Sequence, residues 1–498
     1  MLKSSLLEII RTFTKPELAK FEDFVRSPYF NKKENVTNLF LEIKKYAPDF
    51  KDENLGKEKV WNKLFSGIEY NYGIMKNLIH ELSKLSESFI TMEHANHDKL
   101  RNNIDLLESL LERKVTRVFS SKIDMMEKIY DNPDLKNGNY KIEDYYKFLD
   151  KLYYLKSIYN RHYNIGSTAA YEYTCRSVDY LLYSTIILFY KYYNNYLSHD
   201  HEKILNKGNA AKIYLEGLNK NLIISLLKDV KIKSERDYLI LKCFHEMNIA
   251  LVADADIESY FNFKKSLQDC LDKIPKRDLK DLMTCLINSL RGIGIVKSGS
   301  AENFFKELLK NYNILIENDI FLEPNGMMNG SLFLTYVMTA FALKEFESIE
   351  ILAKKFDNKL PEDRRENDNN YSQAMICYGK KEYSKSLEHI SRIKYELFNM
   401  KHLVKNIQMM NYYELDDYIS FSYVADSYRH FLSKNKSVTS HNKIASEILC
   451  NNINKLFKLR ESFDKFELEK FSKEIKENEL IYKYWILDKI EEIEKVKS

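Results

Sequence analysis

Glycine and proline are scarce in this chain of 498 residues. There are 13 Gly and 7 Pro, roughly 2.6% and 1.4%, against averages of about 7% and 5%. Sheets, barrels and Gly-rich catalytic loops depend on turns that these residues make. Their scarcity argues against Rossmann, P-loop, TIM-barrel and β-sandwich folds and predicts an all-α protein.

An excess of charge of one sign is also missing. The 77 Lys and Arg residues face 73 Asp and Glu, and residues 1–140 carry 23 basic and 22 acidic side chains. A nucleic-acid-binding domain usually concentrates positive charge to displace counterions from phosphate. The even balance therefore makes nucleic acid an unlikely partner.

Cysteine pairs and long apolar runs are lacking as well. The six cysteines form no C-x-x-C pair, and each sits in an apolar helical pattern, which predicts buried, reduced thiols. Glu8 and Arg11 interrupt the apolar N-terminus, so it lacks the core of a signal peptide. The most apolar stretch, Leu181 to Tyr190, has about half of the roughly twenty residues that span a bilayer. We therefore expect a cytoplasmic protein with no membrane segment.

Residues 1–95 are predicted to form a small helical domain. Thr14-Lys-Pro-Glu17 has the spacing of a capping box and starts a helix that Ser27-Pro28 ends. Phe21, Phe24 and Val25 share one face of this helix. Further helices are predicted over 34–46, 56–65 and 72–91.

Two further segments follow. Residues 96–138 read as connecting helices and a linker, with Leu106, Leu107, Leu110, Leu111 and Val115 directed inward and a turn-rich break at 131–138. Residues 139–325 read as an array of antiparallel helix pairs. Its first two apolar stripes are predicted to be Tyr145, Leu149, Leu152, Leu155 and Tyr159, then Val178, Leu181, Thr185, Phe189 and Tyr192.

Residues 326–498 contain the clearest internal repeat. Lys344-Glu-Phe346 and Lys381-Glu-Tyr383 are 37 residues apart, and each lies between two apolar helices. This resembles the tetratricopeptide pattern, whose period is about 34 residues. Lys381, Ser386 and Cys377 replace residues that are usual in that pattern. The resemblance implies an α-solenoid of helix pairs with capping helices at its end.

A broader resemblance covers the chain from end to end. Phe21-Glu-Asp-Phe-Val-Arg-Ser-Pro-Tyr-Phe-Asn31 and Leu55-Gly-Lys-Glu-Lys-Val-Trp-Asn-Lys-Leu-Phe65 resemble the start of an uncharacterised family of large helical bacterial proteins. Ser427-Tyr-Arg-His-Phe-Leu-Ser-Lys-Asn435 and Tyr484-Trp-Ile-Leu-Asp-Lys-Ile490 are similar to its closing segments. The resemblance implies an architecture and no reaction.

Two histidine clusters were weighed as metal sites. His199-Asp200-His201-Glu202 is dense, but adjacent helical residues point apart, so it supplies at most two ligands together. His94 and His97 have a better spacing, yet the sequence places no third ligand beside them. A structural role is favoured for both clusters, and no metal or cofactor is predicted.

Signals for catalysis are weak. There is no G-x-S-x-G elbow, and Gly292-Ile-Gly294 follows no strand, so a helix C-cap is favoured over a phosphate loop. Glu491-Glu492 lies in a charge run typical of a solvated helix face. No residue is assigned as catalytic, and the chain is predicted not to be an enzyme.

Tyrosine is the most suggestive feature, with roughly fifteen between Tyr140 and Tyr196. In the pairs Tyr145-Tyr146, Tyr153-Tyr154 and Tyr192-Tyr193, one ring is expected in the core and its neighbour at the surface, because adjacent helical residues diverge by about 100°. Core packing and codon usage explain most of them. An aromatic binding groove remains the functional alternative.

These observations predict a protein- or peptide-binding scaffold whose concave side lies between about 140 and 400, with no single residue assigned to the partner. One alternative is a DNA-binding regulator, in which residues 56–91 are helix-turn-helix-like and the helical array senses a signal. The longer helix of this segment carries Asn71, Lys76, Asn77 and His80 near its start. Residues 61–90 have no net charge and no Arg, which argues against it. The second alternative is a metal-assisted hydrolase.

Overall fold

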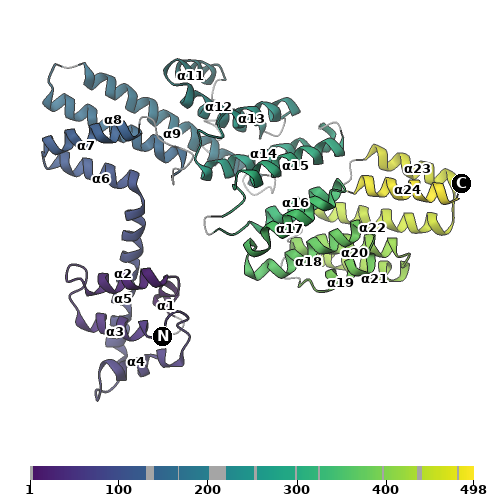
Figure 1. The fold of residues 1–498 in the computed structure, drawn as a ribbon, viewed down its shortest axis with the longest axis horizontal. Coiled ribbons are helices and arrows are strands. Elements are labelled where there is room, and N and C mark those ends of the chain that lie inside the picture. The colour runs from purple at the N-terminus through teal and green to yellow at the C-terminus, as the bar shows by residue number, and fades with distance from the viewer. Residues whose placement is uncertain are drawn as a thin grey trace. The chain divides into compact units, whose positions relative to one another are not determined.

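In a computed structural model, the described residues are 4–130, 140–166, 168–200, 220–251, 255–297, 300–323, 326–394, 398–434, 440–478 and 482–497. They form twenty-three α-helices and two 3-10 helices (Figure 1). Within these ranges there is no strand, only an isolated bridge between Leu322 and Met328. The all-α prediction is confirmed. No helix in the described part of the chain is long and apolar enough to cross a membrane.

The chain forms two compact units. The first comprises Met1–Asn132 and Lys147–Tyr180, and the second comprises Pro133–Tyr146 and Leu181–Ser498. Each is described separately below.

The first unit begins with short helices packed around one long helix. α1, α2 and α3 all contact α5, and α4 packs on α3 (Figure 1). The helices are α1 (Ser5–Ile10), α2 (Lys15–Arg26), α3 (Glu34–Lys44), α4 (Lys57–Leu64) and α5 (Tyr72–His97), with a 3-10 turn η1 (Glu53–Leu55). Their core is apolar, and the Phe21 ring contacts those of Phe40 and Phe89 within it.

Local sequence explains where α2 begins and ends. The Thr14 side chain accepts from the Glu17 backbone N–H, and the Glu17 carboxylate accepts from the Thr14 backbone N–H, so the predicted capping box is present. The helix ends at Arg26, before Ser27 turns to an extended conformation ahead of Pro28. Phe21, Phe24 and Val25 are buried as expected.

The predicted apolar stripe with Tyr145, Leu149, Leu152 and Leu155 is confirmed, because these side chains are buried, whereas two other stripes are wrong in part. The next four helices contain these stripes. They are α6 (Lys99–Glu112), α7 (Thr116–Tyr130), α8 (Ile142–Tyr163) and α9 (Ala169–Asp200). Leu107 is buried, but Leu106 and Val115 are exposed, and so are Val178, Leu181 and Tyr192 on α9. Those inward assignments were wrong because α6 and α9 have apolar side chains on more than one face, so periodicity alone did not identify the packed side. The turn at 131–138 lies outside the described residues.

The second unit continues with helices that pack on their sequence neighbours. They are α11 (Lys220–Lys233), α12 (Glu235–Ala250), α13 (Ile257–Asp269), α14 (Lys276–Lys297), α15 (Ala301–Glu317), α16 (Gly330–Ala342), α17 (Phe346–Phe356), α18 (Glu362–Gly379) and α19 (Tyr383–Ser391). A 3-10 turn, η2 (Asp357–Lys359), follows α17. The unit ends with α20 (Phe398–Glu414), α21 (Tyr418–Lys434), α22 (Ser440–Glu461), α23 (Lys465–Glu477) and α24 (Lys483–Lys497). These neighbour contacts fit an array of helix pairs.

The tight turns after α16, α18 and α20 share one geometry. Lys344, Lys381 and Asp416 have left-handed φ angles of 61°, 62° and 57°. In each turn the next residue's N–H returns to a carbonyl five positions earlier, for example Glu382 to Cys377 at 2.9 Å. This is the Schellman bond that closes a helix end, here without the usual glycine. The third turn was missed because Asp416-Asp-Tyr418 does not share the Lys-Glu-aromatic letters.

Aromatic side chains flank each turn at the same positions. Phe341, Tyr378 and Tyr413 lie three residues before the left-handed residue, and Phe346, Tyr383 and Tyr418 lie two residues after it. Ring centroids are 5.9 Å apart for Phe341–Phe346 and 5.4 Å apart for Tyr378–Tyr383. Phe341 and Tyr378 also touch each other, at 5.4 Å, so the first two turns are in direct contact.

Candidate functional site

A partly open groove of about 970 Å³ lies in the second unit. Its wall contains residues from α14, α15, α16 and α18, from the turns after α16 and α18, from the last residue of α20 and from α24. Nine aromatic side chains line it: Phe304, Phe305, Phe341, Phe346, Tyr378, Tyr383, Tyr482, Tyr484 and Trp485. The aromatic groove is therefore built largely downstream of the Tyr-rich segment 140–196.

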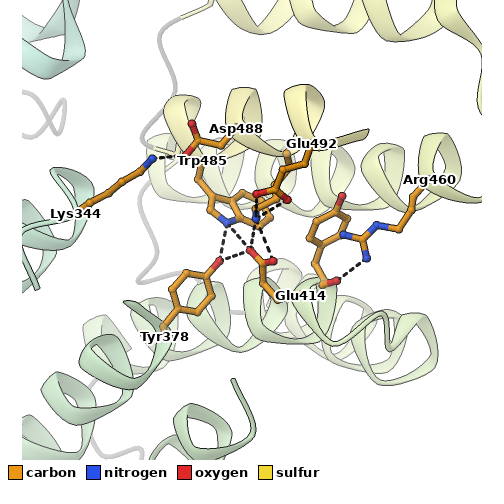
Figure 2. A network of polar contacts seen from close by, with 9 residues as sticks. Lys344, Tyr378, Glu414, Arg460, Trp485, Asp488 and Glu492 are labelled. Carbon is orange, nitrogen blue, oxygen red and sulfur yellow. Dashed lines mark hydrogen bonds and ion pairs between the residues drawn. The ribbon is translucent and has the colours of Figure 1, made fainter. Parts of the chain in front are cut away.

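Glu414 organises the polar end of this groove (Figure 2). Its carboxylate accepts hydrogen bonds from the Tyr378 hydroxyl at 2.8 Å, from Trp485 Nε1 at 3.2 Å and from Lys489 Nζ at 2.8 Å. Trp485 Nε1 also donates to the Tyr378 hydroxyl, at 2.6 Å. Lys489 is buried and also pairs with Glu492, at 2.8 Å. A buried ion pair whose remaining donors and acceptors are hydrogen-bonded avoids the cost of an isolated charge.

The sequence of α24 gives this helix two different faces. Ile486, Ile490 and Ile493 are buried on one face, and α24 packs against α22 and α23. The other face presents Trp485 and Lys489 to Glu414, and Asp488 to Lys344 at 2.5 Å (Figure 2). Spacings of three and four residues place these side chains together on one side of a helix. The last helix thus closes one wall of the groove.

Equivalent positions in the three turns explain why α24 docks where it does. Ala342, Gly379 and Glu414 each follow the aromatic residue of one of the three turns. A Cβ atom on Gly379 would lie 2.4 Å from the Phe346 ring, so the second turn requires glycine there to pack against the first. At the third turn the same position carries Glu414, which holds Trp485 and Lys489 instead.

Two tyrosines at the groove have raised pKa values. Burial, and then the neighbouring Glu414 carboxylate, raise the pKa of Tyr378 well above its usual value. The same two causes raise the pKa of Tyr383 to about 12. Both hydroxyls therefore remain hydrogen-bond donors at neutral pH. Arg460 stabilises the third turn. Its guanidinium carbon lies 4.0 Å from the centroid of the Tyr413 ring, and its Nη1 pairs with the Asp416 carboxylate at 3.0 Å.

The residues weighed for metal binding do not converge. His94 and His97 are exposed at the end of α5, and the described residues contain no group of three or more side chains able to hold a metal ion. The side chains of His199-Asp200-His201-Glu202 lie outside the described residues. Among the described residues that line the groove there is no His or Cys. Such a wall offers apolar contact, hydrogen bonds and charge.

Three other sequence assignments have structural outcomes. Gly294 breaks α14 with φ 73° and ψ 177°, a conformation outside the helical region. Glu491 is exposed and pairs with Lys495 at 2.6 Å, as a solvated face would, whereas Glu492 reaches the buried Lys489. Cys175 is exposed, so the prediction that every cysteine is buried was wrong; it lies on the open side of α9.

The tyrosine pairs behave differently from one another. Tyr153 is buried and Tyr154 is exposed, as predicted. Tyr145 and Tyr146 are both buried, which corrects the expectation for that pair. Tyr146 remains in the core because its hydroxyl donates to Asp237 at 2.9 Å, and the cation of Arg236 lies 5.7 Å from the Tyr145 ring.

In the segment that could contact DNA, one polar side chain is already hydrogen-bonded within the chain. The Asn71 side chain caps α5 by accepting from the Ile74 backbone N–H at 3.0 Å. Lys76, Asn77 and His80 are exposed on the same helix. Three exposed side chains in a segment of no net charge give no specific support for a DNA interface.

Glu414, Trp485 and Lys489 were not identified from the sequence as members of one site. A signal for Glu414 was present: aligning Tyr413 and Tyr418 with Tyr378 and Tyr383 places it opposite Gly379. Nothing comparable in the sequence connects α24 to that turn.

No family model, no characterised relative and no solved structure matches the chain.

Proposed function

We propose that this chain is a non-enzymatic scaffold of tandem, tetratricopeptide-like helix pairs that binds a protein or peptide in the groove. The observation that carries the proposal is the groove of about 970 Å³ with its nine aromatic side chains. Aromatic rings provide large contact areas at low cost in side-chain entropy, which suits partner binding.

The groove is also preorganised. At its polar end, hydrogen bonds within the chain join four side chains, those of Tyr378, Glu414, Trp485 and Lys489. A wall that is already ordered loses little conformational freedom when a ligand enters. The volume is at the upper end of the range of about 300–1,000 Å³ for drug-sized ligands. It therefore offers room for several side chains of a peptide.

Comparative affinity purification tests the proposal. The full chain is compared with Met338→Arg, which places a charge in the groove wall, and with Ile419→Arg, a matched change at an exposed apolar side chain outside it. We expect a protein recovered with the wild type and with Ile419→Arg, and lost with Met338→Arg. Direct binding of the recovered protein to the purified chain then confirms the contact.

Circular dichroism and thermal melting of each variant establish that the comparison is between folded proteins. Phe305→Arg, which changes the groove from α15, provides a second variant should Met338→Arg be unstable. Recovery of the same proteins by the wild type and both groove variants would contradict the proposal.

A further inference from the structure

Every carboxylate that lines the groove has a lysine partner within the chain. The lining contains four acidic residues, and each has a lysine partner: Glu414 and Glu492 pair with Lys489 at 2.8 Å, Asp488 with Lys344 at 2.5 Å and Glu491 with Lys495 at 2.6 Å. A cationic ligand entering the groove would compete with these lysines for the carboxylates.

The basic side chains are not balanced in the same way. The lining has five basic residues, and two of them, Arg291 and Lys381, have no carboxylate within ion-pair distance among the described residues. Among the described residues, Arg291 donates to the neutral Tyr312 hydroxyl, at 3.0 Å. Lys381 is exposed at the left-handed turn after α18 and lines the groove. Both cations are available to an incoming anion.

We infer that the partner is a peptide segment that carries bulky apolar side chains and carboxylates. This inference rests on the proposed function and specifies its ligand. The apolar side chains would pack on the aromatic wall, and the carboxylates would meet Lys381 and Arg291 at the edge. Charge complementarity of this kind directs encounter and selects partners.

The same charges disfavour a nucleic acid. Five basic and four acidic side chains leave the lining with one net positive charge. A nucleic-acid strand presents a phosphate at every nucleotide and needs several cations to displace its counterions. Two unpaired cations suit one or two carboxylates on a peptide better than a polyphosphate backbone.

Trp485 provides a direct probe of binding. The chain has two tryptophans, Trp61 in the N-terminal core and Trp485 in the groove, so Trp61→Phe leaves one fluorophore at the site. Three sets of short synthetic peptides share Phe and Leu at fixed positions. They differ elsewhere in carrying Asp and Glu, Lys and Arg, or Asn and Gln.

We expect the acidic set to bind at least about tenfold more tightly than the basic set, and this difference to shrink as salt rises. Equal binding of all sets, or tighter binding of the basic set, would overturn the inference while leaving peptide binding intact. Binding by none of the sets would overturn the proposed function as well. Competition by a single-stranded oligonucleotide as strong as by the acidic set would also contradict the inference.

Variants at Lys381 and Arg291 test whether these two cations cause the preference for acidic peptides. Lys381→Asn keeps a residue that tolerates positive φ and removes the charge, and Lys381→Glu reverses it. We expect Lys381→Asn to reduce the acidic preference several-fold and Lys381→Glu to abolish or invert it. Lys470→Glu, an exposed lysine on α23 outside the groove, should leave the preference unchanged.

Arg291→Gln tests the second cation from a different helix, and its effect should have the same direction as that of Lys381→Asn. If the two Lys381 variants and Arg291→Gln retain the wild-type preference, the unpaired cations do not select the partner and the inference fails.

Discussion

The N-terminal helices and the C-terminal helix pairs bury different aromatic residues. Among the described residues, the core around α5 contains buried Phe and one Trp but no buried Tyr. From α16 onward, five buried Tyr appear: Tyr336, Tyr371, Tyr378, Tyr413 and Tyr428. A phenyl ring needs only apolar neighbours, whereas a buried phenol is more stable with a hydrogen-bond partner, which Tyr336, Tyr378 and Tyr428 have. The first core needs only the correct helical faces, and the second also needs specific pairings.

The strongest test of this difference is the substitution Phe21→Ala. Phe21 is fully buried, with ring contacts to Phe13, Phe40 and Phe89. We expect a loss of about 3–5 kcal/mol in the free energy of unfolding, because the cavity adds to the lost burial. Denaturant unfolding followed by Trp61 fluorescence, in a Trp485→Phe background, measures it. A loss below about 1 kcal/mol would show that this core repacks freely.

The corresponding change at the groove is Glu414→Ala. It removes the carboxylate that Tyr378, Trp485 and Lys489 share, and leaves Lys489 buried with Glu492 as its remaining partner. We expect a loss of about 3–4 kcal/mol, followed by Trp485 fluorescence in a Trp61→Phe background.

The double variant Glu414→Leu with Lys489→Met serves as the control. Replacing both charges with apolar residues should recover much of the lost stability, since the cost comes from a buried cation that has lost one of its two carboxylates. A double variant as unstable as Glu414→Ala would mean that packing around α24 dominates over charge.

Opposite pH responses should separate the two regions. Burial raises the pKa of Asp368 on α18 to about 6. The folded state then holds the proton more firmly than the unfolded state, so this group's contribution to stability falls as pH rises from about 4 to about 6, by up to about 3 kcal/mol. Asp368→Asn should flatten this dependence and stabilise the protein above pH 6. Part of the slope should remain, because burial also raises the pKa of Asp278 to about 6.

Glu42 on α3 should show the opposite pH dependence, because its pKa is lowered and not raised. Burial raises its pKa, but hydrogen bonds from Lys45 and Lys63 outweigh this and lower the pKa overall. Its contribution is present above the unfolded pKa and is lost as pH falls through the folded value. Denaturant titrations at several pH values compare Glu42→Gln with Asp368→Asn. Slopes of the same sign at both sites would refute the contrast.

The smallest expected effects compare two tyrosines on one helix. The Tyr378 hydroxyl accepts from Trp485 and donates to Glu414, so Tyr378→Phe should lose about 1–2 kcal/mol. The Tyr371 hydroxyl is buried with no hydrogen-bond partner among the described residues. Tyr371→Phe should therefore be neutral or slightly stabilising. Thermal melting of both variants measures the difference, and equal losses would show that ring packing alone decides stability there.

The sequence predicted the parts of the fold that depend on neighbouring residues. The capping box at Thr14, the end of α2 before Pro28 and the buried face of Phe21, Phe24 and Val25 all follow from interactions within about four positions. The stripe on α9 was misassigned for a related reason. Periodicity shows that a helix has an apolar face, but the packing partner decides whether that face is covered.

The recurrent turns were partly predictable. The shared Lys-Glu-aromatic letters at 344 and 381 identified two of them, whereas the third uses Asp416 and Asp417 in the same backbone conformation. A left-handed helix end is selected by backbone geometry and can accommodate several residue types, Asp among the better ones.

The scarcity of Gly and Pro together with the helical periodicity determined the all-α class, because helix formation depends on local spacing. The groove was decided by tertiary structure. Its central hydrogen bonds join Tyr378 to Glu414, Glu414 to Trp485 and Tyr378 to Trp485 across 36, 71 and 107 positions of the chain. Such partners meet only when whole helices pack, so a glutamate, a tyrosine and a tryptophan that are unremarkable in the sequence become one polar cluster in the folded protein.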